Sequence, residues 1–132
     1  MNRVMARVRA MQLVYEWEMG GEGGEQTRLG LLEVRPDEEE YGFMTRLFEG
    51  VVANAAALDA RIAQCAHGWS LERLSRVDLA ILRLALYELS LGQTPSNVVV
   101  SEALEMARQY STEKSPRFIN GVLGAASRSE GA

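Results

Sequence analysis

The stretch LSRVDLAILRLALYELSL, from Leu74 to Leu91, most constrains what this chain can fold into. Read as a helix, it carries apolar residues around almost its whole circumference, which is typical of a helix packed on several sides. Charged residues interrupt its apolar runs, so it does not fit a membrane span. We therefore expect the central helix of a helical domain. Only a narrow arc is predicted to face solvent or a partner: Arg76, Leu79, Ala80, Arg83 and Tyr87.

One acidic residue, Glu88, falls in the middle of the apolar face of this predicted helix. Burying a carboxylate without hydrogen-bond donors is costly, so Glu88 needs donors close by. Free backbone N–H groups at the start of another helix are the donors that we expect. Glu88 is accordingly assigned a structural role and not a catalytic one.

Apolar periodicity predicts further helices on both sides of the central one. The first covers residues 2–19, and a glycine-rich loop at residues 20–24 ends it. A short amphipathic piece follows around residues 26–33. Pro36 and Asp37 then open a helix that we expect to continue to about Ala66, with Gly42 and Gly50 leaving room for close helix approach.

Two more helices are predicted after the central one. Gly92 and Pro95 make a turn, and Ser96 or Asn97 caps a helix that runs to Tyr110. Ser115 followed by Pro116 is a strong start signal for a last helix, which is expected to end near Ser127 before a frayed tail. Strand signals are nearly absent, so the sequence indicates an all-α bundle.

Length and composition fit one globular domain spanning residues 1–132. The chain has 132 residues, of which 47% are hydrophobic, and a net charge of −4 argues against coating nucleic acid by charge alone. The single cysteine, Cys65, excludes an internal disulfide and fits a reducing compartment. With no apolar signal core at the N-terminus, we expect a cytoplasmic protein without a membrane segment.

Patterns for catalysis, metal binding or a cofactor are absent from the sequence. The acidic run Asp37–Glu40 is interpreted as a dipole-matched helix start, because it has no histidine or second acidic cluster at ligand spacing. His67 has no serine or cysteine nucleophile pattern around it, and a histidine suits a helix C-terminus. We therefore expect no metal, no cofactor and no enzyme activity.

Three stretches carry a more specific pattern: ARVRAMQLVY at Ala6–Tyr15, VDLAILRLALYEL at Val77–Leu89, and VVSEALEMARQYSTEKSPRFINGVL at Val99–Leu123. Their order and spacing resemble the NusB family of bacterial transcription antitermination factors. The resemblance covers essentially the whole chain and implies a bundle of about seven helices in two small subdomains. A similar domain begins an rRNA cytosine methyltransferase, but no methyltransferase half follows here, which favours the free-standing factor.

The resemblance implies binding to the single-stranded BoxA segment of nascent ribosomal RNA transcripts. It implies that the chain acts jointly with NusE, a small-subunit ribosomal protein, in an antitermination complex with RNA polymerase. By position, the implied RNA-binding residues are Arg3, Arg7, Gln12, Lys114, Ser115, Arg117 and Phe118. The implied NusE-binding residues are Tyr15 and Asp78. Arginines can neutralise phosphates, and an exposed phenylalanine can stack on an unpaired base. A homodimer that hides the RNA face is left open.

The sequence departs from the family pattern at several of these positions. Where the family commonly has consecutive arginines, this chain has Arg3-Val4-Met5, and Val8 stands where a glutamate is usual. Lys114 stands where an acidic residue is usual and can restore one positive charge. Because lost phosphate contacts weaken RNA binding, we expect weak binding alone and useful binding only with NusE.

The same residues also have purely structural interpretations. Phe118 can equally be a core residue, Arg3 and Arg7 ordinary surface, and Asn120-Gly121 a close-packing pair with a mainly structural role. One alternative function is a protein-interaction module of the same fold that has lost RNA binding. The other alternative function is that of an enzyme, either a small hydrolase or a methyltransferase fragment, but no residue supports catalysis.

Overall fold

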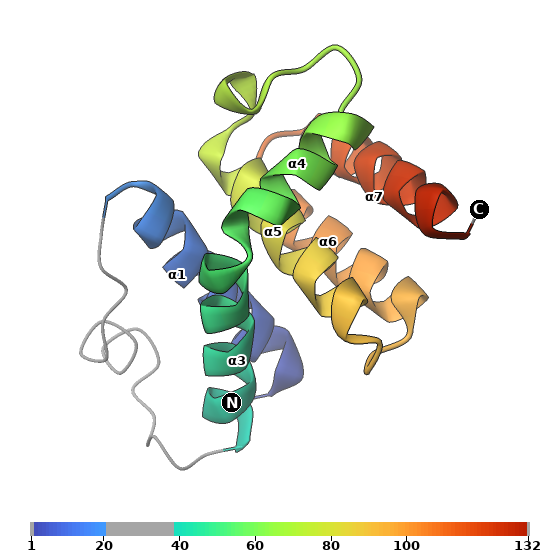
Figure 1. Ribbon diagram of the computed structural model, residues 1–132. Helices are drawn as coiled ribbons and strands as arrows, with labels where there is room; N and C mark the ends of the chain where they lie inside the picture. The colour runs from blue at the N-terminus through green and yellow to red at the C-terminus, as the bar shows by residue number, and fades with distance from the viewer. Residues whose placement is uncertain (1, 21–38, 132) are drawn as a thin grey trace.

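The computed structural model describes residues 2–20 and 39–131, which are drawn in colour in Figure 1. These residues form α1 (Arg3–Glu18), α3 (Glu39–Ala53), α4 (Ala55–Cys65), the 3-10 turn η1 (Leu71–Arg73), α5 (Arg76–Leu91), α6 (Ser96–Tyr110) and α7 (Ser115–Gly131). No strand occurs in this part of the chain, so the all-α prediction is confirmed. The amphipathic piece at residues 26–33 and the helix start at Pro36 and Asp37 lie outside the described residues.

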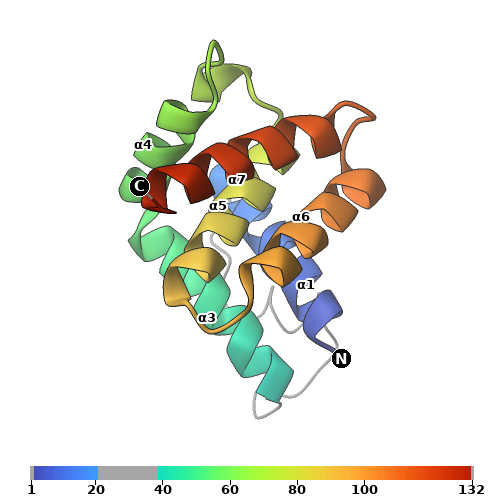
Figure 2. The same cartoon turned by 90° about the vertical axis from the view of Figure 1, so that its right-hand side faces the viewer.

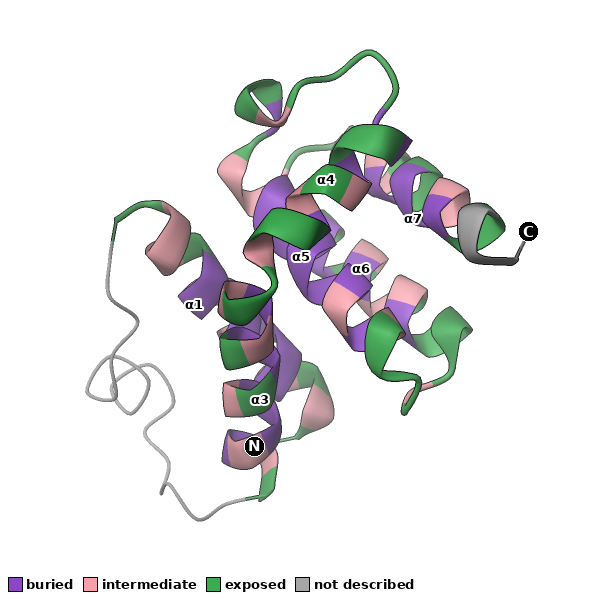
Figure 3. Ribbon diagram, viewed as in Figure 1, coloured by how far each residue is buried: buried purple, intermediate pink, exposed green. Residues whose placement is uncertain are grey.

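Helix α5 lies at the centre of the bundle (Figures 1 and 2). Helices α1 and α3 pack on each other and on α5. Helices α4, α6 and α7 also pack on α5. Figure 3 shows how far burial extends along α5, and every residue from Asp78 to Leu86 is buried. The central-helix prediction is thus confirmed.

The exposed arc predicted on α5 is wrong for three of its residues. Leu79 and Ala80 are each 1% exposed, and Arg83 is 5% exposed. The guanidinium of Arg83 donates to Asp59 on α4 at 2.8 Å and to Glu18 on α1 at 2.6 Å, so ionic contacts close this side of α5. Burial on its own would lower the pKa of Arg83, but the hydrogen bonds to Asp59 and Glu18 together with their negative charges outweigh it, and the pKa is raised.

Local chemistry fixes both ends of α5. The hydroxyl of Ser75 accepts a hydrogen bond from the backbone N–H of Asp78 at 2.9 Å, which caps the first turn. Gly92 ends the helix in the left-handed conformation with φ of 66°, where a residue without Cβ is unstrained. Ser75 therefore starts α5 slightly later than the sequence pattern indicated.

The single long helix predicted up to Ala66 is instead two helices, because the chain breaks at Asn54. The side-chain amide of Asn54 donates to the carbonyl oxygen of Gly50 at 2.7 Å, and its backbone has left the helical conformation. Asparagine competes in this way with helical hydrogen bonding. The break lets α4 cross α5 in a new direction (Figure 1).

Helix bounds elsewhere lie close to the predicted ones. Pro95, and not Ser96 or Asn97, precedes α6, and α7 begins at Ser115 and continues to Gly131. Asn2 caps α1 by accepting from the N–H of Met5 at 2.8 Å. Among the described helices, none combines the length and the apolar character needed to cross a bilayer.

The partner of Glu88 differs from the expectation. Its carboxylate is 2% exposed and accepts two hydrogen bonds from the guanidinium of Arg7, not from the N–H groups of a helix start. The hydrogen bond to Glu88 raises the pKa of Arg7. The burial of Glu88 was predicted correctly, but the group that donates hydrogen bonds to it was predicted wrongly.

Candidate nucleic-acid interface

A carboxylate from α5 holds the turn between α6 and α7. The hydroxyl of Ser111 donates to Oδ1 of Asp78 at 2.6 Å, and the hydroxyl of Ser115 donates to Oδ2 at 3.0 Å. Ser115 Oγ also accepts from the backbone N–H of Thr112 at 3.2 Å. Since Asp78 and Ser115 are 8% and 1% exposed, this cluster is an internal clamp that sets the start of α7.

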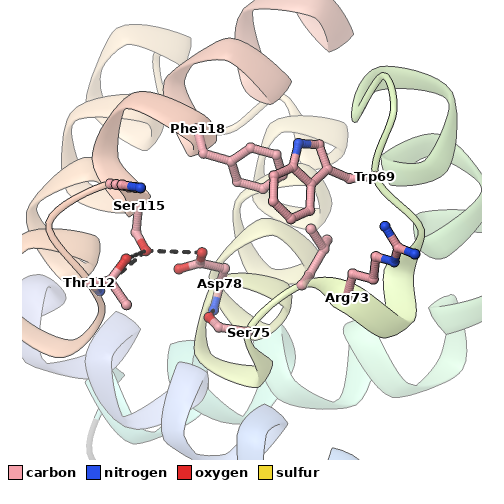
Figure 4. A pocket seen from close by; sticks show the side chains of 9 residues that line it. Trp69, Arg73, Ser75, Asp78, Thr112, Ser115 and Phe118 are labelled. Carbon is pink, nitrogen blue, oxygen red and sulfur yellow. Dashed lines mark hydrogen bonds between the residues drawn. The ribbon is translucent and has the colours of Figure 1, made fainter.

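A cavity of about 210 Å³ opens beside this clamp. It is called the aromatic pocket here, and Figure 4 shows the side chains that line it. The rings of Trp69 and Phe118 form one wall, with their centroids 5.9 Å apart and their planes 63° apart. Trp69 is 52% exposed, so its ring is open to solvent. The pocket residues are Trp69, Arg73, Leu74, Ser75, Asp78, Thr112, Lys114, Ser115 and Phe118.

The aromatic pocket is positively charged at its rim. Arg73 and Lys114 line it, and Arg117 is exposed one turn into α7. Within the described parts of the chain, neither Lys114 nor Arg117 has an ion-pair partner. The carboxylate of Asp78 is occupied by serine hydroxyls. Open aromatic rings beside unpaired cations suit a ligand that combines flat bases with phosphates.

A smaller hollow of about 180 Å³, the tyrosine hollow, lies between α1, α5 and α6. Its lining residues are Met11, Gln12, Tyr15, Val77 and Tyr110. Tyr15 and Tyr110 are 37% and 41% exposed, and Gln12 accepts a hydrogen bond from Arg9 at 2.9 Å. Two exposed aromatic side chains on adjacent helices form a surface of the kind that binds another protein.

Two of the three arginines of α1, Arg3 and Arg7, form ion pairs within the molecule. Arg7 is 6% exposed and bound to Glu88. Arg3 forms ion pairs with Glu39 at 3.4 Å and Glu40 at 3.2 Å, and its guanidinium lies 3.9 Å from the ring centre of Phe43. Neither arginine is thus a free phosphate contact at the α1 surface.

The structure brings together only some of the residues that the family pattern singled out. Lys114, Ser115 and Phe118 meet at the aromatic pocket, while Gln12 and Tyr15 lie at the tyrosine hollow. Asp78 was expected to meet a basic partner, but it lies inside the clamp and not beside Tyr15. Arg7, Asp78 and Ser115 are buried in internal contacts in this structure, and their roles in binding RNA or NusE stay predictions.

Sequence reasoning missed two residues of the aromatic pocket, Trp69 and Arg73. Trp69 lies in the connector between α4 and η1, and half of it is exposed. A tryptophan in a short connector with an arginine four residues later is the signal that could have indicated a binding surface. No group of three or more potential metal-ligating side chains occurs among the residues that the structure describes.

Comparison with known proteins places the whole chain in one family. The family model described as "NusB family" matches residues 5–128. Transcription antitermination protein NusB of Clostridium botulinum is 39% identical over 140 residues, covering 94% of this chain and 98% of its own. The protein of the same name from Listeria welshimeri is 40% identical over 124 residues, covering 93% of this chain and 94% of its own.

Solved structures agree with this result. T. maritima NusB superposes with a TM-score of 0.86 at 32% identity, covering 97% of this chain and 92% of that one. A structure described as antitermination factors NusB and NusE in complex with dsRNA gives a TM-score of 0.85 at 26% identity, covering 98% and 99%. Both curated relatives are described as transcription antitermination proteins. The chain belongs to the NusB family of transcription antitermination proteins.

Proposed function

We propose that this chain binds single-stranded BoxA-type RNA of nascent ribosomal RNA transcripts together with a NusE-type ribosomal protein. It does so in the cytoplasm, within an antitermination complex with RNA polymerase. The observation that carries the proposal is the aromatic pocket, where the exposed ring of Trp69 and the partly buried ring of Phe118 lie beside Lys114 and Arg73. Stacking on such rings and charge neutralisation are the two main contributions to single-strand binding.

The protein partner is assigned to the tyrosine hollow. Tyr15 and Tyr110 are exposed there on adjacent helices, and the hollow shares no residue with the aromatic pocket. RNA and protein can thus bind side by side on one molecule. A family relative solved with NusE and double-stranded RNA supports this pairing of ligands.

Because Arg7 is paired with Glu88 and Arg3 with Glu39 and Glu40, fewer cations are open to phosphates, and binding without NusE is expected to be weak. Fluorescence anisotropy of a labelled BoxA-type RNA tests the proposal, with and without NusE and at two salt concentrations. Tighter and selective binding when NusE is added is the expected result. A scrambled RNA and a duplex of the same sequence are the controls.

Absence of selective binding in either condition would overturn the proposal. Capture of NusE without RNA would then support the alternative, a protein-interaction module of the NusB fold. Internal pairing of Arg3 and Arg7 is the observation that favours that alternative.

A further inference from the structure

A second hollow, of about 270 Å³, shares only Trp69 and Phe118 with the aromatic pocket. It lies between the C-terminal end of α4 and one face of α7, and is called the α4–α7 groove. The aromatic pair is thus a wall common to both cavities. The groove residues are Cys65, Ala66, His67, Trp69, Arg117, Phe118, Gly121, Val122, Ala125 and Arg128.

The charged side chains described in the α4–α7 groove are all positive. Among the residues whose side chains are described, no aspartate or glutamate lines it, whereas Arg117 and Arg128 stand along the same helix face. The two arginines are eleven residues apart, about 16 Å along a helix. Over the described residues, neither has an ion-pair partner. The groove is therefore a cationic track that starts at the aromatic pair.

At Gly121, the surface of this track is helix backbone without a side chain. Gly121 is exposed, and a Cβ added there would meet no atom within 4 Å. Close packing therefore does not explain the glycine, which corrects the interpretation of Asn120-Gly121 as a packing pair. A missing side chain at this point leaves the helix surface open to a ligand.

We propose that the α4–α7 groove binds the nucleotides that flank the BoxA segment on the same single-stranded RNA, with Arg128 contacting a phosphate. The inference rests on the proposed function and extends it to a second subsite. Its chemistry offers ring stacking and cations but few donors or acceptors for base edges. Binding of the flanking nucleotides should thus tolerate any sequence.

The test compares three labelled RNAs, all with NusE present: the BoxA-type core, and the core lengthened by a short uridine run at its 5′ or its 3′ end. One lengthened RNA should bind about five-fold tighter or more, as expected for one added contact between Arg128 and a phosphate. Its salt dependence should steepen by about 0.7 in the logarithmic slope for each added phosphate contact.

Three variants localise the effect. Arg128→Gln should remove the gain in affinity from lengthening and leave core binding unchanged. Gly121→Glu places a carboxylate on the open helix surface and should also remove the gain, while Gly121→Gln, of equal size and no charge, should retain more of it. Arg108→Gln is the matched control, because Arg108 is exposed on α6 and paired with Glu105.

The outcomes separate the two proposals. If the core RNA fails to bind, the proposed function fails and this inference with it. If the core binds but neither lengthened RNA gains affinity, or the gain survives Arg128→Gln, the α4–α7 groove is not an RNA subsite and the proposed function stands.

Discussion

Arg7 and Glu88 form a buried, two-pronged ion pair between α1 and α5. Nε and Nη2 of the arginine lie 2.8 Å from Oε1 and Oε2 of the glutamate, and the side chains are 8% and 3% exposed. Planar guanidinium and carboxylate groups match best in this geometry. The pair joins the first helix to the central one and gives Arg7 a role in the fold.

Glu88→Gln should lower the free energy of unfolding by roughly 3 kcal/mol, because a buried guanidinium then lacks its counter-charge. Urea unfolding measures the loss. The double variant Arg7→Met/Glu88→Leu removes both charges and should recover most of it. Unchanged stability of Glu88→Gln would contradict the buried pair, and folded Glu88→Gln should still bind NusE and RNA.

The second prediction concerns the clamp that Asp78 forms with Ser111 and Ser115. Asp78→Asn replaces one hydroxyl acceptor by an amide nitrogen, which cannot accept, so the α6–α7 turn should loosen. Amide hydrogen exchange of residues 111–116 should become faster, and RNA affinity should fall because Phe118 loses its fixed position. Ser111→Ala breaks one bond of the clamp and should have a smaller effect.

If exchange in the turn is unchanged in Asp78→Asn, the clamp does not set the start of α7. A direct role of Asp78 in binding a basic protein partner would instead reduce NusE capture with no change in exchange. The two measurements therefore separate an internal role of this carboxylate from an interfacial one.

Sequence periodicity could predict which residues are buried but not which ones meet. Glu88 was placed correctly on a buried face, yet its partner lies 81 residues away, and Ser115 reaches Asp78 across 37 residues. Such pairs depend on how helices cross, which a single-helix pattern does not contain. The family resemblance transfers positions and not exposure, so it did not show that Arg7 is buried while Lys114 and Phe118 line a surface hollow.

Local breaks were equally hard to predict. Asn54 ends α3 through one side-chain hydrogen bond to Gly50, and alanines on both sides favour a continuous helix. Trp69 has an apolar side chain, so its exposure contradicts the usual expectation for tryptophan. Residues that depart from a local rule in this way, as Trp69 does, concentrate at functional surfaces.

The third prediction contrasts two glycines of α3. A Cβ at Gly50 would overlap the ring of Tyr87 on α5, whereas one at Gly42 would meet only Arg46 at 3.7 Å. Gly50→Ala should destabilise the protein by about 1–3 kcal/mol through overpacking. Gly42→Ala should stabilise it by up to about 1 kcal/mol, because alanine favours a helix.

Thermal unfolding of Gly50→Ala and Gly42→Ala measures these changes in stability. Adding Tyr87→Leu to Gly50→Ala should restore part of the loss, since the smaller side chain leaves room for the methyl group. Equal effects of the two alanine variants would show that helix propensity, and not the contact with Tyr87, governs position 50.

The fourth prediction tests the aromatic wall. Phe118→Leu keeps an apolar side chain against the core but removes the ring, so RNA affinity should fall by the 1–3 kcal/mol typical of one lost base stack. Anisotropy with NusE present measures the change. Tyr110→Leu, an exposed aromatic residue outside the aromatic pocket, should leave RNA binding without NusE unaltered.

The fifth prediction concerns the positive charge of Lys114, which lines the aromatic pocket without an ion-pair partner among the described residues. Lys114→Gln should weaken RNA binding and reduce the slope of log affinity against log salt by about 0.7, the value for one phosphate contact on a single strand. Arg108→Gln changes net charge equally at an exposed site that does not line the aromatic pocket and should leave the slope unchanged. If both variants reduce affinity alike with no change in slope, Lys114 acts only through overall charge. A reduced slope for Lys114→Gln alone would show that this lysine supplies a phosphate contact that the internally paired Arg3 and Arg7 do not.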